Sequence, residues 1–143
     1  MPGLSRSSRL RQSGYTLEAL FVLWGVRLAL YLLPYHRVKR LFQRSAHVAP
    51  RRSLAAVLTN FRTAVHFTPK ATCLVQAVAG QHLLASYGYA SVLHLGVARA
   101  HGKFKAHAWL CHSDVPVIGT ISNLDEYRPL GEYSTVAVTR RLS

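Results

Sequence analysis

The chain has 143 residues, and its 50% hydrophobic content excludes a mainly disordered protein. Eighteen Lys and Arg side chains against five acids give a formal net charge of +13, which favours an acidic protein, a nucleic acid or an anionic lipid surface as partner. Two cysteines cannot build a disulfide framework, and no histidines are paired as HxH or HExxH, so we expect no metal and no cofactor.

The N-terminal third is first polar, then apolar, then basic. Residues 1–13 are small, polar and basic, and we expect a disordered tail. Leu17–Leu33 is the most apolar run, but Glu18 and Arg27 interrupt it, and it is short for a membrane span. We expect a core or partner-binding helix here, with interfacial membrane contact through residues 17–44 as the alternative. Residues 14–52 then form apolar and basic helices that pack as one unit with residues 53–143.

Two helices follow with recognisable starts. Ser53 is placed to cap a helix that runs to about Val65 with a regular apolar stripe. Thr72 is placed to cap a second helix, which Gly88 ends. Cys73 then lies in the first turn, where the helix dipole favours the thiolate and unpaired N–H groups can hold an oxyanion.

A histidine follows on a strand. Ser91–Val97 and Phe104–Cys111 read as two strands, and alternation places His107 and Trp109 on one face of the second. An imidazole that meets a thiol can take its proton and return it to a leaving amine. We expect Trp109 to be a core residue rather than a substrate platform. Cys111 is expected to be a structural thiol, and His112 a solvated turn residue.

The order of the elements predicts the fold class. Three or four helices precede three or four strands, which indicates an α+β fold with an antiparallel sheet. Ser122–Gly131 reads as a loop, and Tyr133–Thr139 reads as a last strand. A cysteine helix packed on a sheet that carries the histidine would bring Cys73 and His107 together.

The pattern TCL…LLASYGYASVLHLGVAR…FKAHAWL…PVIG, within residues 54–130, resembles the stand-alone leader peptidases of lasso-peptide gene clusters. These proteins form part of the transglutaminase-like branch of the papain-like cysteine hydrolases. The resemblance implies a cytoplasmic cysteine peptidase that removes the leader from a ribosomally made precursor peptide. It further implies Cys73 as nucleophile, His107 as general base and acid, and two partners: a small leader-recognition protein and a lasso cyclase.

The third catalytic group is left open by the sequence. The family is described with an acid on the strand after the histidine. A tight turn at Ser113–Asp114 instead sets Gly119 or Thr120 opposite His107, and neither is an acid. The candidates for orienting the imidazole are therefore Asp114, Asn123, Asp125 and a backbone carbonyl.

Two other functions are compatible with parts of the sequence. A transglutaminase-type amide transferase would use the same thiol chemistry with an amine as the acceptor. A non-enzymatic nucleic-acid-binding protein would explain the charge, but no stacking platform or reader motif accompanies the basic residues, so we do not expect nucleic acid as a partner.

Overall fold

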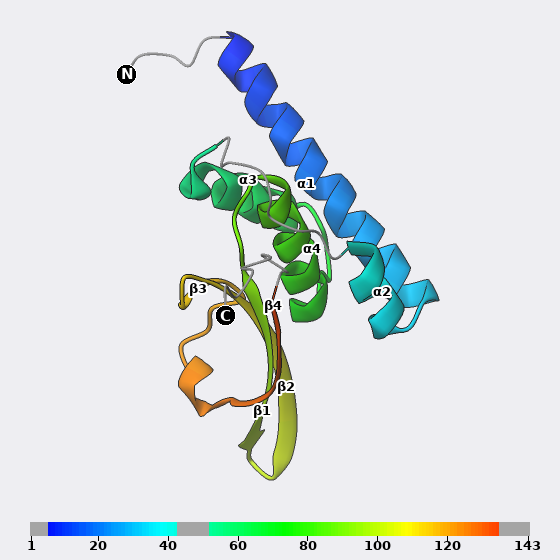
Figure 1. Ribbon diagram of the computed structural model, residues 1–143, viewed down its shortest axis with the longest axis vertical. Helices are drawn as coiled ribbons and strands as arrows, with labels where there is room; N and C mark the ends of the chain where they lie inside the picture. The colour runs from blue at the N-terminus through cyan, green and yellow to red at the C-terminus, as the bar shows by residue number, and fades with distance from the viewer. Residues whose placement is uncertain (1–5, 43–51, 135–143) are drawn as a thin grey trace, which may run out of the picture.

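The computed structural model describes residues 6–42 and 52–134. Over these residues, four α-helices precede a four-stranded antiparallel sheet, which confirms the predicted α+β class. The helices gather against one face of the sheet, at one end of it (Figure 1). Their bounds are α1 (Arg6–Leu32), α2 (Tyr35–Phe42), α3 (Leu54–His66) and α4 (Cys73–Ser86). A short 3-10 helix η1 (Leu124–Glu126) precedes the last of the strands β1 (Val92–Ala100), β2 (Lys103–His112), β3 (Val115–Ile118) and β4 (Arg128–Ser134).

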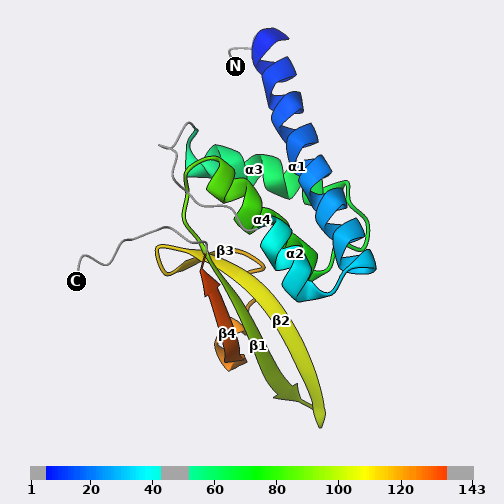
Figure 2. The same cartoon turned by 45° about the vertical axis from the view of Figure 1, so that its right-hand side comes forward.

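The sheet has the strand order β3-β2-β1-β4 and is built on two tight hairpins. His101 and Gly102 have φ of 51° and 75°, and Ser113 and Asp114 have φ of 49° and 64°. Two consecutive residues with positive φ are typical of the type I′ turns that match strand twist. The first hairpin is longer than the predicted strands, and its distal half extends beyond the helices (Figure 2).

The core lies between the helices and one face of the sheet. Phe61 of α3, Leu84 of α4 and Leu110 of β2 are fully buried there. α4 approaches the sheet closely because Gly80 has no side chain: a Cβ at this position would lie 2.3 Å from Ile118 Cδ1 and 3.5 Å from Leu110 Cδ2. This contact fixes the height of α4 over β2 and β3.

Both predicted helix caps are present. The Ser53 hydroxyl accepts a hydrogen bond from the Ala56 N–H at 3.2 Å, and Thr72 Oγ1 accepts one from the Val75 N–H at 3.3 Å. The central residues of the stripe predicted for α3, Val57, Leu58 and Phe61, are buried. Sequence alone therefore located the starts of α3 and α4 and the buried face of α3.

The predicted disordered tail is wrong over residues 6–13, because α1 begins at Arg6. Once a helix is nucleated by a packed segment, each added residue gains a hydrogen bond at little cost, and Arg, Leu and Gln are good helix formers. Ser13 Oγ also donates to the Arg9 carbonyl at 2.9 Å. Residues 1–5 lie outside the described part of the chain.

The last strand begins earlier than predicted. β4 starts at Arg128, inside the stretch expected to be a loop, and pairs with Val92–Val97 of β1. Pro129 is tolerated because β4 is an edge strand among the described strands, and an edge strand can dispense with one ladder N–H. The end of the predicted strand, residues 135–139, lies outside the described residues.

A polar contact joins α1 to the end of α4. The Tyr87 hydroxyl donates to Glu18 Oε2 at 2.6 Å. Burial, reinforced by the hydrogen bond to Glu18, raises the pKa of Tyr87 to about 12. The Arg52 guanidinium lies 3.5 Å from the centre of the neighbouring Tyr15 ring. The start of α3 and the end of α4 are therefore both held against α1, close to Tyr15 and Glu18.

Candidate active site

Cys73 is the first residue of α4 and is half-buried. Thr72 binds the Val75 N–H through its side chain and the Gln76 N–H through its carbonyl at 3.0 Å. The N–H groups of Cys73 and Leu74 precede the first of these bonds, at the positive end of the helix dipole. The approach to the helix is held by Arg27, whose Nη1 donates to the Pro69 carbonyl at 2.7 Å.

Cys73 lies on the side of α4 that faces the sheet. Residues seven apart in a helix point in nearly the same direction, so Cys73 shares the face of Gly80, which lies against Leu110 and Ile118. The other end of α4 is placed by Tyr89, whose ring lies 5.6 Å from that of His112. The C-terminal end of α4 thus lies near His112, and its first residue, Cys73, lies at the opposite end of the helix. Cys73 is roughly 10 Å from Gly80 along the helix axis.

His107 lies on the face of β2 that the helices do not cover. Ala108 and Leu110 belong to the main core, whereas His107 and Trp109 point to the other side, as alternation predicted. The Trp109 indole is stacked between two imidazoles, at 5.3 Å from His94 and 6.1 Å from His107. Gly96, the residue paired with His107, leaves room for the Trp109 indole, because a Cβ at position 96 would lie 2.9 Å from the indole ring. Trp109 is buried, so its predicted core placement is confirmed.

A backbone carbonyl fixes the His107 ring. Nε2 lies 2.6 Å from the Gly119 oxygen. Because a carbonyl oxygen only accepts, Nε2 carries the proton and Nδ1 of the neutral ring keeps its lone pair. This is the tautomer that a general base needs when Nδ1 faces the nucleophile. The sequence had set Gly119 or Thr120 opposite His107 and had kept a backbone carbonyl among the candidate orienting groups.

Gly119 also connects the histidine to the cysteine helix. Gln76, one turn after Cys73, lines a cavity of about 290 Å³ together with Gly119, Thr120 and Phe61. The short segment after β3 therefore has two neighbours. Gln76, near the start of α4, shares a cavity with Gly119 and Thr120, and the His107 imidazole is hydrogen-bonded to the Gly119 carbonyl. Over residues 6–42 and 52–134, no hydrogen bond joins the Cys73 thiol to the His107 imidazole, and the two side chains lie on opposite sides of the sheet. The proposal below therefore requires a movement that brings them together.

The three side chains considered as orienters are placed elsewhere. Asp114 is exposed in the β2–β3 turn. Asp125 is exposed in η1, and the Asn123 amide donates to Glu126 Oε2 at 3.3 Å. The loop does return to the histidine, but through Tyr127, whose ring lies 5.5 Å from the imidazole. No periodic signal marks Tyr127, because its position depends on the path of the whole 119–127 segment.

Two nearby predictions have different outcomes. Cys111 is a buried cysteine on the same strand, in line with its expected structural role. His112 is not solvated as expected: its Nδ1 donates to the Ala90 carbonyl at 2.6 Å, because the short connection from α4 to β1 passes over it. Over residues 6–42 and 52–134, no three His, Cys, Asp or Glu side chains are grouped as a metal site would require.

Comparison with known proteins gives one result. The family model described as the transglutaminase-like superfamily matches residues 20–132, from the middle of α1 to β4. No curated protein and no solved structure gives a significant match.

Proposed function

Because the chain belongs to the transglutaminase-like superfamily, which includes cysteine peptidases and transglutaminases, we propose that it is a cysteine peptidase. Its substrate in this proposal is a ribosomally made lasso-peptide precursor, from which it removes the leader. The lasso assignment is supported by the sequence resemblance around TCL and HAW. The peptidase chemistry is supported most directly by the ring of His107, held through Nε2 so that Nδ1 is left as a base.

The proposed reaction has two stages. The reaction requires a conformation in which His107 Nδ1 reaches the Cys73 sulfur. In it, Nδ1 takes the thiol proton as the sulfur attacks the scissile carbonyl, and the N–H groups at the start of α4 stabilise the oxyanion. The imidazolium then protonates the departing amine of the core peptide, which leaves the leader as a thioester on Cys73. Water, deprotonated by His107, hydrolyses the thioester and restores the free thiol.

The orienting group differs from the carboxylate of a Cys-His-Asp triad. A carbonyl dipole holds the ring and partly stabilises the imidazolium, but it supplies no full negative charge. Asp114, Asn123 and Asp125 stay as candidates only for a state in which the 119–127 loop moves. In the described conformation, we assign the orienting role to the Gly119 carbonyl.

The proposed partners are the precursor peptide, a small leader-recognition protein and a lasso cyclase that receives the freed core. The stand-alone leader peptidases that the chain resembles act with a separate leader-recognition protein. We therefore expect cleavage to depend on the recognition protein, and equal rates with and without it would contradict this part of the proposal.

The test is cleavage of the precursor by the reconstituted proteins, followed by mass spectrometry. Cys73→Ala is expected to abolish cleavage while the fold is retained. Cys111→Ser is the matched control, since it removes the other thiol, and it is expected to stay active. Full activity of Cys73→Ala would refute the assignment.

Transglutaminase-type transfer is the second candidate, because the superfamily includes both chemistries. An amine in place of water would resolve the same thioester into a new amide. The mass of the leader product separates the two reactions: hydrolysis leaves a free carboxylate, and transfer leaves an amide.

A further inference from the structure

α1 is apolar on two opposite sides. Ala19, Leu23 and Val26 are completely buried against the rest of the protein. A second row of large apolar side chains is exposed to solvent: Leu17, Phe21, Trp24, Leu28 and Tyr31. At about 100° per residue the centres of the two rows are roughly 160° apart. A helix that is apolar all round needs cover on both sides, and the protein itself covers only one.

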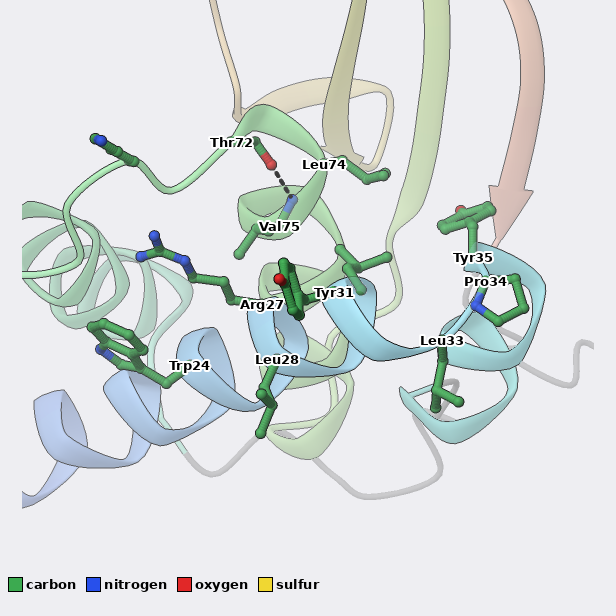
Figure 3. Close-up of a pocket in the computed structure, with 12 residues that line it drawn as sticks. Trp24, Arg27, Leu28, Tyr31, Leu33, Pro34, Tyr35, Thr72, Leu74 and Val75 are labelled. Atoms are coloured by element: carbon green, nitrogen blue, oxygen red, sulfur yellow. Dashed lines mark hydrogen bonds between the residues drawn. The ribbon is translucent and has the colours of Figure 1, made fainter.

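The exposed row is continuous and accessible. Its alternating spacing of four and three residues keeps it straight along α1 for roughly 21 Å. α1 runs along the outside of the helices, and its N-terminal half extends past α3 (Figure 1). At the other end, Trp24, Leu28 and Tyr31 line an open groove of about 810 Å³, together with Leu74 and Val75 from the start of α4 (Figure 3).

The charges around this row are almost all positive. α1 and α2 contain seven basic residues: Arg6, Arg9, Arg11, Arg27, Arg37, Lys39 and Arg40. Their one acid is Glu18, whose carboxylate accepts the hydrogen bond from Tyr87 on the inner side. Basic groups therefore lie at both ends of the apolar row, and the nearest carboxylate points away from it.

We propose that the outer face of α1 binds the surface of an anionic lipid bilayer, with the helix lying in the plane of the membrane. An apolar row with Trp and Tyr, bordered by arginines, is the composition of interfacial helices. α1 is long and apolar enough to cross a bilayer. Crossing would, however, remove Ala19, Leu23 and Val26 from the core, so the packed helix lies on the surface instead.

Charge decides between lipid and a second copy of the chain. Pairing two α1 helices along this row would bring two sets of arginines together on molecules that each carry +13. The row also spans only about two heptads, fewer than the three or four expected of a coiled coil. An anionic bilayer meets both requirements at once, since it supplies negative charge and an apolar layer. This proposal is independent of the peptidase reaction.

The test uses vesicles of phosphatidylcholine with about one-third phosphatidylglycerol, against vesicles of phosphatidylcholine alone. Trp24 is the reporter, because Trp109, the other tryptophan, is buried. We expect flotation with the anionic vesicles, a blue shift of tryptophan emission, and weaker binding at about 0.5 M salt.

Two matched variants locate the site. Phe21→Ser and Phe104→Ser each remove an exposed phenylalanine, 79% and 74% accessible, so neither threatens the fold. Phe21→Ser is expected to weaken vesicle binding about tenfold, as loss of a buried aromatic side chain implies, and Phe104→Ser to leave it unchanged. Absent binding, equal losses in both variants, or a dimer that forms through α1 without lipid binding would each overturn the proposal.

Discussion

Gly119→Ala is expected to reduce both stability and activity, for reasons that can be separated. Gly119 has φ of 78°, a conformation that costs a residue with a side chain about 1–2 kcal/mol. A Cβ at this position would also lie 2.7 Å from the Ala108 carbonyl oxygen and 3.2 Å from Trp109 Cα. Both are backbone atoms, so the clash has to be relieved by moving the chain, at a further cost of about 1–3 kcal/mol.

Gly102→Ala is the matched control. Its φ is 75°, almost the same, but no atom lies within 4 Å of the added Cβ. This variant should lose only the conformational cost. Urea unfolding of both proteins is the assay, and the difference between the two losses measures the clash alone. Equal losses would show that the space around Gly119 is not as described.

The same substitution should affect catalysis through the His107 ring. Relief of the clash moves the 119 carbonyl, which holds Nε2 at 2.6 Å. We expect the cleavage rate of folded Gly119→Ala to fall at least tenfold, since the ring loses its fixed tautomer. Gly102→Ala should cleave at the normal rate. Normal cleavage by folded Gly119→Ala would refute the role of the carbonyl.

Three further predictions follow from the helices and thiols. The pKa of Tyr87 is raised from 10.0 to about 12, so the folded state holds this proton more tightly, and stability should fall by about 2–3 kcal/mol between these pH values in denaturant titrations. Tyr87→Phe should remove this loss of stability at high pH. If the variant keeps the same pH profile of stability, Tyr87 is not the group responsible. Thr72→Ala should lower the free energy of unfolding by about 1 kcal/mol in urea titrations, because the Val75 N–H loses its capping hydrogen bond. A clearly smaller decrease would contradict the capping role of Thr72. In the folded protein iodoacetamide should modify Cys73 and spare buried Cys111, as peptide mapping would show; equal labelling would contradict their placement.

Local signals predicted the local features of the site. Caps and apolar spacing located the helix that begins at Cys73, and alternation placed His107 with Trp109 on one face of β2. Register counting from the Ser113–Asp114 turn placed Gly119 or Thr120 opposite His107, and in the structure the Gly119 carbonyl holds the ring. Each of these inferences depends on residues within about a dozen positions of one another, where backbone geometry leaves few choices.

The features that sequence did not predict depend on distant packing. Tyr127 reaches His107 only because the chain after Gly119 turns back across the open face of the sheet. His112 is held by the Ala90 carbonyl, which belongs to the preceding helix–strand connection. The two apolar rows of α1 have the same helical spacing, and only the packing of α3 and α4 decides which one is buried. Periodicity cannot separate two such rows.

The long β1–β2 hairpin has a consequence for the order of folding. Its nine residue pairs, from Ala100–Lys103 to Val92–Cys111, close around the two-residue turn at His101 and Gly102. Hairpins of this kind form within about 1–10 μs, because little chain entropy is lost in joining neighbouring residues. We therefore expect the pairing of His107 with Gly96 to form in a local nucleus before the distant cysteine helix docks. Changes in the turn should slow folding itself, whereas changes at the start of α4 should act mainly on the rate of unfolding.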